Sequence, residues 1–329
     1  MGTAGLSDNT RAILLLCGGL GKPRTVEPRP LSPKEYSRVA AWLSVRDLHP
    51  AQLDNKAAAR LQANPVPGLD AGRLQALLAR GRSLKAWLAW LAGYDLWVLG
   101  RTDAGYPSRL EQRLGALAPP LLYGCGSSEL LDRGGLAVVG SRNAHVRCLA
   151  FARQAAARCA GEGFQVVSGG ARGVDQAAMM TTLGEGGEVV GVLPGSLHKA
   201  AASSRWREGV ADGRLALMTP FEPDAEFSVG VAMGRNRFIY LLSDWALVVD
   251  AAAGSGGAWA GAQEALKQGF VPVFVYRGES ASAGNDLLLA QGAVPLTFSD
   301  LDRKKFSRWL KNKAAGLEDN QVPQQPSLF

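Results

Sequence analysis

Two glycine-rich segments each place an arginine where a buried strand is expected to end. Gly140-Ser141-Arg142 follows the apolar run Leu136–Val139, and Ser168-Gly169-Gly170-Ala171-Arg172 follows a second apolar run. Turns of this kind present backbone N–H groups and helix starts, and both bind anions. An arginine adds nothing to a turn, but its guanidinium fork matches the oxygens of a phosphate. A phosphate cradle is therefore predicted at Gly140, Ser141, Arg142, Ser168, Gly169, Gly170 and Arg172, and a pair of purely structural turns is the alternative.

Two further segments are candidates for the same site. Arg235, Asn236 and Arg237 are expected near the start of a helix, where positive side chains oppose the helix dipole and an anionic ligand would compensate. Ser255, Gly256 and Gly257 follow an expected strand that ends at Asp250 and precede a helix. They are expected to close the pocket from its other side, and a flexible loop is the alternative.

No catalytic or metal-binding residue is assigned from the sequence. His49, His145 and His198 lack metal-ligand spacing and have no paired carboxylate. Asp175, at the end of the second glycine segment, is expected to orient the turn rather than act as a base. We therefore assign none of these residues to catalysis or to a metal, and we expect no cofactor.

The segments around these turns alternate between strand and helix patterns. Strands are expected at Leu136–Val139, Phe164–Ser168, Val189–Leu193, Leu215–Met218, Ala246–Asp250 and Val271–Tyr276, and helices at about 144–162, 174–184, 199–211, 234–243 and 258–268. Continuous apolar strands with intervening helices are typical of a doubly wound, mostly parallel α/β sheet. Ligands bind at the carboxyl ends of the strands in such sheets, so the turns should meet at one edge.

The remaining chain predicts two flanking parts. Residues 1–95 read as a small helical domain of SAM-like or helix-hairpin-helix-like type, which would bind DNA backbone or serve as a packing accessory. Residues 96–300 form the α/β domain. Residues 301–329 are expected to be a basic helix, over 301–313, followed by a polar disordered tail. The helix either extends a nucleic-acid path by stacking Trp309 on a base or is a solvated face over a packed tryptophan.

Composition supports an acidic partner and a reducing compartment. The 329 residues carry a formal net charge of +7, which mildly favours nucleic acid. The four cysteines lack CxxC spacing, and no apolar run reaches the ~18 residues of a membrane span. A cytoplasmic protein is expected, with Ala12–Leu20 as a core helix rather than a signal segment.

The sequence resembles the DprA/Smf family of DNA-processing proteins, whose core is an extended Rossmann fold. The resemblance runs from about residue 95 to 297 and rests on motifs in the same order. These are Asp103-Ala104-Gly105-Tyr106-Pro107 with Leu110, Val138-Val139-Gly140-Ser141-Arg142, Ser168–Asp175, Arg235-Asn236-Arg237 with Ile239, Gly254–Gly257 with Ala258 and Ala262, and Gly284-Asn285 with Gly292-Ala293. It implies binding of single-stranded DNA without enzymatic activity, help in loading a RecA-type recombinase, and a homodimer formed through the Rossmann domain.

Several positions depart from the family pattern. Met179 stands where the family usually has histidine, and Ser196-Leu197-His198-Lys199 replaces an expected Tyr-Pro pair. Thr219-Pro220-Phe221-Glu222 replaces a Ser-Glu pair, and no C-terminal winged helix is expected. A divergent branch is indicated, and the process served (transformation, repair or phage defence) stays open.

The last residues add a partner hypothesis. Gln325, Ser327, Leu328 and Phe329 resemble the short peptide by which bacterial repair proteins dock on the polymerase sliding clamp. An adaptor that recruits the clamp in repair or defence is therefore one alternative. A nucleotide-signal sensor or nucleotide-processing enzyme of the same superfamily is the other, although the PGGxGTxxE motif of the hydrolases is missing after Pro194-Gly195.

Overall fold

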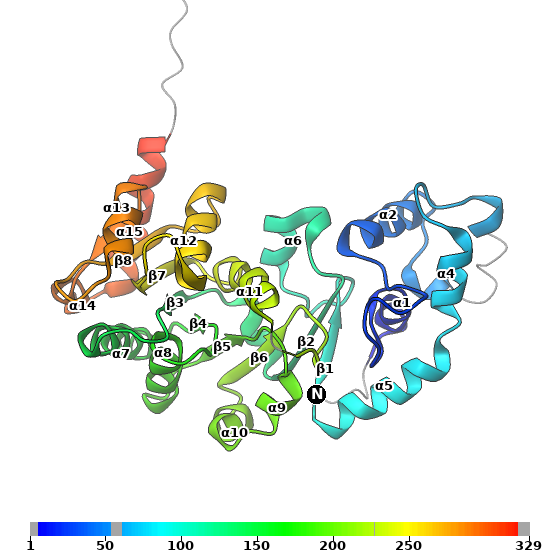
Figure 1. Cartoon of the computed structure of the whole chain (residues 1–329), viewed down its shortest axis with the longest axis horizontal. Helices are drawn as coiled ribbons and strands as arrows, with labels where there is room; N and C mark the ends of the chain where they lie inside the picture. Colours follow the sequence, from blue (N-terminus) through cyan, green and yellow to red (C-terminus); the bar gives the residue numbers. More distant parts are fainter. Residues whose placement is uncertain (1–5, 54–60, 227, 322–329) are drawn as a thin grey trace, which may run out of the picture. The chain divides into compact units, whose positions relative to one another are not determined.

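A computed structural model of the chain describes residues 6–53, 61–226 and 228–321. The chain divides into two compact units, whose elements Figure 1 labels. Unit 1 comprises residues 1–132 and 193–231, and unit 2 comprises residues 133–192 and 232–329. The predicted boundary at residue 95 falls inside unit 1, because the first segment of this unit runs to residue 132. The chain then passes through unit 2 and returns to unit 1 at residue 193.

Unit 1 begins with helices, as the sequence predicts. The core helix α1 (Asp8–Cys17) is capped by Ser7, and α2 (Pro33–Ser44) starts with a capping box between Ser32 and Glu35. The unit also contains η2 (Pro50–Gln52), α4 (Ala71–Leu78), α5 (Gly81–Gly93), α6 (Ser108–Leu114), η3 (Gly115–Leu117), η4 (Ser128–Asp132), α9 (Leu197–Ala201) and α10 (Ser204–Ala211). The expected single helix over 199–211 is wrong, since Ser203 caps α10 and so separates it from α9.

Three strands of unit 1 pair antiparallel in the order β1 (Trp97–Gly100), β2 (Leu121–Gly126), β6 (Leu215–Thr219). The sequence predicts Leu215–Met218 as a strand of the mostly parallel sheet. Within unit 1, however, this strand pairs antiparallel with β2. Asp103 follows β1 and accepts from Gly100 N (2.8 Å) and Thr10 Oγ1 (2.7 Å), while the Tyr106 hydroxyl donates to Pro119 O (2.8 Å). Asp103 and Tyr106 of the first family motif therefore fix the segment between β1 and β2 by hydrogen bonds.

The described residues of unit 2 form six strands, and these pair parallel throughout. They run in the order β5 (Val189–Val192), β4 (Val166–Ser168), β3 (Leu136–Gly140), β7 (Trp245–Asp250), β8 (Val273–Tyr276), β9 (Val294–Leu296). The chain proceeds from β3 to one side through β4 and β5, then returns to the other side of β3 at β7. The order therefore reverses between β3 and β7, which confirms the doubly wound, mostly parallel class.

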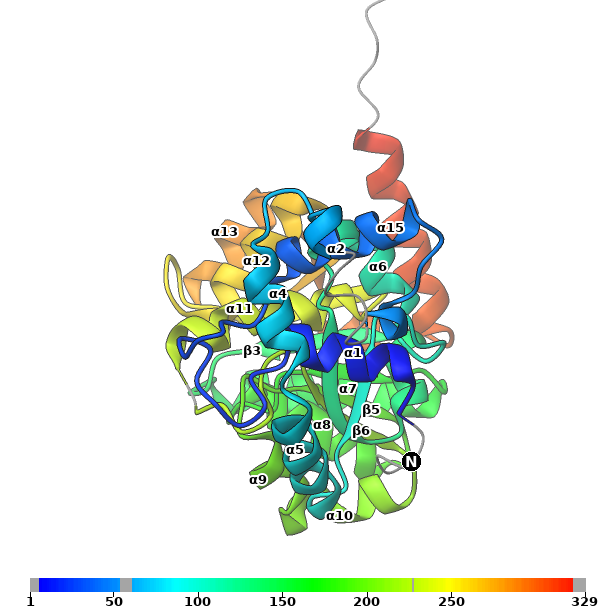
Figure 2. The same cartoon turned by 90° about the vertical axis from the view of Figure 1, so that its right-hand side faces the viewer.

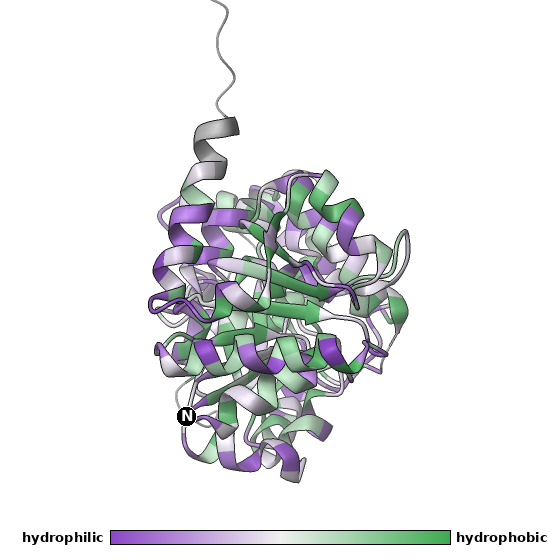
Figure 3. Cartoon of the chain, turned by 90° about the vertical axis from the view of Figure 1, so that its left-hand side faces the viewer, coloured by the Kyte–Doolittle hydropathy of each residue, from purple (hydrophilic) through white to green (hydrophobic). Residues whose placement is uncertain are grey.

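Helices cover both faces of these strands. α7 (Val146–Gly161) and α8 (Val174–Gly184) lie on one face, while α12 (Gly256–Gln268) and α13 (Ala283–Ala290) lie on the other, as Figure 1 shows. α11 (Val229–Leu241) leads into β7, and its residues from Ala232 onward belong to unit 2. The apolar strands stand out in green against the mixed outer helices in Figure 3.

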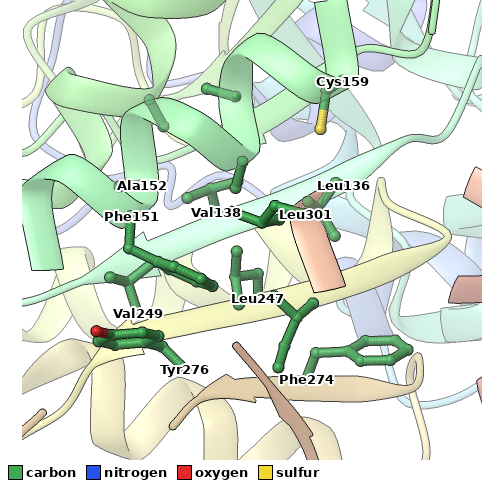
Figure 4. Close-up of a cluster of buried hydrophobic side chains, with 14 of the residues drawn as sticks. Leu136, Val138, Phe151, Ala152, Cys159, Leu247, Val249, Phe274, Tyr276 and Leu301 are labelled. Carbon is green, nitrogen blue, oxygen red and sulfur yellow. The ribbon is translucent and has the colours of Figure 1, made fainter. Parts of the chain in front are cut away.

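One hydrophobic core of unit 2 lies between the strands β3, β7 and β8 and the helix α7 that covers them. Phe151 of α7 stacks on Tyr276 at 4.1 Å, and Leu247 and Phe274 pack beside them, as Figure 4 shows. Leu301, at the end of α14 (Phe298–Leu301), and Phe306 belong to the same buried cluster. The C-terminal helices are thus part of this core.

The last described helix is longer than expected. α15 (Phe306–Gln321) continues past residue 313, so the prediction of a disordered tail from 314 is wrong as far as 321. Its start is fixed by Glu162, whose carboxylate accepts from Phe306 N (2.6 Å) and Ser307 N (2.9 Å). Trp309 packs between Phe274 and Phe306, so the structure favours the packed-tryptophan interpretation. The predicted clamp-binding residues 325–329 lie outside the described residues.

None of the described helices is long and apolar enough to span a membrane.

Candidate functional site

Two loops of unit 2 meet at the point where the strand order reverses. The loop after β3, Gly140–Arg142, is called the first turn. It is bound to the end of β7, because Ser141 N donates to Asp250 O at 2.9 Å. The crevice beside such a reversal is where doubly wound sheets bind ligands. The structure therefore places the predicted first turn at the position that the fold favours for a site.

The first turn leaves its arginine exposed. The register with β7 shifts between Val139 and Gly140, which bends the chain out of the sheet. Ser141 Oγ then accepts from Asn143 N at 3.1 Å and closes the turn. Arg142 is exposed, and its charge lowers the pKa of the nearby buried Arg235.

The second turn, Ser168–Gly173, is built against the first. The buried Ser168 hydroxyl donates to Val138 O at 2.6 Å, and Val174 N donates to Ser141 O at 3.3 Å. Gly173 has φ +83°, a conformation that side chains rarely adopt, at the start of α8. Arg172, one residue earlier, is exposed. The two predicted arginines are thus presented by turns that are bonded to each other.

Asp175 lies beneath the second turn and is only 5% exposed. Its carboxylate accepts from Ala171 N at 3.4 Å, which confirms that it orients the turn. Burial raises the pKa of Asp175 to about 6, although Arg235 and the backbone N–H groups of the turns act in the opposite direction. A carboxyl that ionises this late in the folded chain makes stability depend on pH.

Asp175→Asn should gain stability relative to the wild type as the pH rises from about 4 to about 7. The Asp175 carboxyl ionises near pH ~4 in the unfolded chain but at about 6 when folded. Its contribution to stability is therefore complete below pH ~4 and is lost as the pH rises through about 6. Two pKa units correspond to ~3 kcal/mol. Urea unfolding of both proteins across this range measures the difference, and parallel pH profiles would contradict it.

Arg235 lies under the turns rather than on the surface. Its side chain is 4% exposed, and its Nη1 donates to Gly169 O at 2.5 Å and to Val192 O at the end of β5. We call this residue with its two carbonyl acceptors the arginine clasp. Burial lowers the pKa of Arg235 to about 10, and Asp175 partly offsets that effect. The clasp ties the carboxyl ends of β4 and β5 together.

Asn236 and Arg237 are also engaged within unit 2. Asn236 Nδ2 donates to Gly257 O at 3.0 Å, so α11 holds the loop that precedes α12. Arg237 lies 3.8 Å from Glu264 of α12 and is 32% exposed. The Asp250 carboxylate at the end of β7 accepts from Ser282 N at 2.9 Å.

The prediction that Arg235, Asn236 and Arg237 lie near the start of a helix is wrong. α11 begins at Val229, so Arg235 lies in its second turn and not at its N-terminus. The burial of Arg235 instead indicates a positioning role. Direct contact of Arg235, Asn236 and Arg237 with a ligand stays a prediction.

The loop Gly254–Gly257 presents another helix start. Ser255 and Gly256 are exposed, and Gly257 is half-buried beside Asn236. Within the described part of the chain, Ser255 makes no side-chain capping bond to α12. The first N–H groups of a 13-residue helix are therefore available to an anion, and this loop follows β7 at the strand-order reversal.

Asn285 belongs to a motif that the sequence shows, but the sequence predicts no function for it. Asn285 of α13 is 1% exposed, donates to Val249 O (3.0 Å) and Tyr276 O (2.8 Å), and accepts from Ala251 N (2.9 Å). It therefore fixes the carboxyl ends of β7 and β8. Its motif, Gly284-Asn285, is visible in the sequence, but its three bonds are not.

Metal ligation has no support among residues 6–53, 61–226 and 228–321, where no group of three or more His, Cys, Asp or Glu side chains could hold an ion.

The fold and these turns define a doubly wound α/β protein whose glycine-rich turns lie at its strand-order reversal. Within this class, the chain belongs to the family of DNA recombination-mediator protein A, whose sequence profile matches residues 97–303. A DprA-like protein of Mycobacterium tuberculosis is 32% identical over 196 residues, which cover 56% of this chain and 48% of that relative. Protein Smf of Escherichia coli is 30% identical over 226 residues, 66% of this chain and 58% of that protein. The resemblance to DprA/Smf is thus confirmed, and the chain spans about half the length of these relatives.

Two solved structures share the fold. DNA processing protein A of Streptococcus pneumoniae is 22% identical, with a TM-score of 0.56 over 81% of this chain and 95% of that chain. DNA processing protein A of Helicobacter pylori is 25% identical, with a TM-score of 0.55 over 66% of this chain and 96% of that chain. The latter structure concerns the single-stranded DNA binding mode of the Helicobacter protein.

Proposed function

We propose that this protein binds single-stranded DNA at the first and second turns and acts without catalysis. The observation that carries the proposal is the pair of exposed arginines, Arg142 and Arg172, presented by two turns that are hydrogen-bonded to each other. The arginine clasp also holds the second of these turns. Two exposed cations on turns that internal hydrogen bonds hold in place suit successive phosphates of a chain. Membership of a recombination-mediator family and the single-stranded DNA binding of the Helicobacter relative support the same ligand.

The loop Gly254–Gly257 would supply a third phosphate contact. Its exposed helix start lies beside the end of β7, and the first turn is bonded to that same strand end. A phosphodiester strand needs anion sites in a row, whereas a mononucleotide needs one. Several adjacent sites in unit 2 therefore favour the DNA strand over the alternative of a nucleotide sensor or nucleotide-processing enzyme.

Replacing both exposed arginines should nearly abolish binding. Arg142→Ala with Arg172→Ala should weaken the affinity for a single-stranded oligonucleotide about a hundredfold, since a charge-assisted bond contributes roughly 1.5–3 kcal/mol. The slope of log affinity against log salt should fall by ~1.4, because each phosphate contact on a single strand contributes ~0.7. Fluorescence anisotropy at several salt concentrations measures both quantities.

A matched control removes two positive charges elsewhere on unit 2. Arg153 of α7 and Lys267 at the end of α12 are exposed, and neither belongs to the turns. Arg153→Ala with Lys267→Ala should change affinity by less than about threefold. Equal losses in both double variants would mean that net charge alone drives binding. Tight binding of a mononucleotide with no oligonucleotide binding, measured by calorimetry, would favour the sensor.

The finer role follows the family resemblance and the sequence. We infer help in recombinase loading, with a RecA-type recombinase as partner, and a homodimer, which light scattering would test. Sliding-clamp recruitment rests on Gln325, Ser327, Leu328 and Phe329 alone. Clamp pull-down that persists after deletion of residues 325–329 would refute that role.

A further inference from the structure

Four aromatic rings form a continuous group on α5 and α9 in unit 1, and none of them belongs to the turns described above. Trp87 stacks on Trp90 with ring centres 4.6 Å apart and planes inclined by 5°. Tyr94 lies 5.0 Å from Trp90, and His198 lies 5.5 Å from Trp90 and 5.4 Å from Tyr94. We call these four residues the aromatic cluster. Figure 2 shows α5 and α9 close together.

The aromatic cluster runs from the core to the solvent. Trp87, Trp90 and Tyr94 are three and four residues apart, so they follow one face of the helix. Trp87 is 5% exposed and anchored with Leu84 and Leu91, Trp90 is half-buried, and Tyr94 is 38% exposed. The inner rings fill the core, but the outermost ring is supported from beneath and open to solvent.

His198 is held in place by its own segment. Ser196, at the N-cap of α9, has a left-handed backbone with φ +51°, which is strained for a residue other than glycine. Ser196 N donates to Ala225 O at 2.8 Å, and His198 Nδ1 lies 3.2 Å from Pro223 O. This is the segment where the sequence departs from the family pattern. The departure thus places a third ring type against Trp90 and Tyr94.

Positive charges accompany the rings. Arg82 and Lys85 of α5 and Lys199 of α9 are exposed, and neither helix contains a carboxylate. Asp95 follows α5, and its charge acts on the Cys125 thiol in β2. Of these cations, Lys199 is next to a residue of the aromatic cluster, and an exposed aromatic ring with a nearby cation is the combination by which proteins hold single strands without reading their sequence.

We propose that the aromatic cluster is a base-stacking subsite for single-stranded DNA, with Tyr94 as the platform. A nucleobase would lie on the exposed Tyr94 ring, and an adjoining phosphate would approach Lys199, the residue after His198. The stacked rings beneath fix the platform before binding, so little side-chain entropy is lost. The proposal rests on single-stranded DNA being the ligand. It gives unit 1 a base contact of its own.

The test compares a thymidine oligonucleotide with an abasic strand of the same length and charge. Tyr94→Ala should bind the thymidine strand about tenfold more weakly than the wild type and the abasic strand equally well. Tyr94→Phe, which keeps the ring, should bind both strands as the wild type does. Quenching of a 2-aminopurine base by the wild type should be lost in Tyr94→Ala and kept in Tyr94→Phe.

The salt slope separates this proposal from the phosphate site. Tyr94→Ala should leave the slope unchanged, whereas Arg142→Ala with Arg172→Ala should lower it. If the wild type and Tyr94→Ala bound the thymidine strand with equal affinity, the aromatic subsite would be overturned and the proposed function would stand. Absence of any oligonucleotide binding by the wild type would overturn both. Far-ultraviolet circular dichroism and the melting temperature establish that Tyr94→Ala is folded.

Discussion

Arg235→Met should lower the free energy of unfolding by about 3 kcal/mol. The Gly169 and Val192 carbonyls are buried and would lose a cationic donor, and each such bond contributes roughly 1.5–3 kcal/mol. Part of the loss is returned, because methionine does not have to be desolvated as a guanidinium does. Urea unfolding at neutral pH measures the change.

The same variant distinguishes a positioning role from direct contact. If the arginine clasp only holds the second turn against the end of β5, Arg235→Met should weaken oligonucleotide binding severalfold with an unchanged salt slope. The turns would then sample other arrangements, but the number of phosphates neutralised would stay the same. A slope that falls by ~0.7 would instead establish Arg235 as a phosphate contact, as the sequence predicts.

Arg237→Met is the matched control for stability. Arg237 lies two residues further along α11, is 32% exposed and forms one ion pair with Glu264. Partly exposed pairs contribute ~1 kcal/mol or less, so this variant should unfold close to the wild type. Equal destabilisation by both methionine variants would remove the special status of the arginine clasp.

The strands and turns of unit 2 were predictable because their signals are local. Leu136–Val139 is apolar throughout and ends at glycine, which suffices for a buried parallel strand. The glycine that permits the φ of +83° at position 173 also stands in the sequence. The location of both turns at one edge follows from topology, since parallel strands that alternate with helices end on the same side.

The role of Arg235 was not predictable because it depends on contacts distant in sequence. The acceptor Gly169 lies 66 residues away and Val192 lies 43 residues away. A sequence shows a charge but not its burial, so an arginine in a polar triplet reads as a surface cation. The start of α15 at Phe306, rather than at residue 301, was missed for a related reason, since Glu162 of a distant segment holds its first turn.

Gly173→Ala should destabilise the fold by about 3 kcal/mol and weaken DNA binding. Gly173 has φ +83° and ψ −127°, a region where a side chain costs roughly 1–3 kcal/mol. An added Cβ would also lie 2.4 Å from Ser141 O and 2.7 Å from Arg142 O. Both atoms are backbone, so the first turn itself would have to move, and with it Arg142. Thermal unfolding and anisotropy measure the two effects.

Gly186→Ala supplies the control that separates strain from collision. Gly186 has φ +76° in the turn after α8, and nothing lies within 4 Å of an added Cβ. This variant should therefore lose only ~1 kcal/mol from the backbone conformation and should bind DNA as the wild type does. If Gly173→Ala were no more harmful than Gly186→Ala, the contact between the two turns would not set the position of Arg142. A larger loss of affinity in Gly173→Ala alone would mean that the phosphate site depends on the two turns being bonded together.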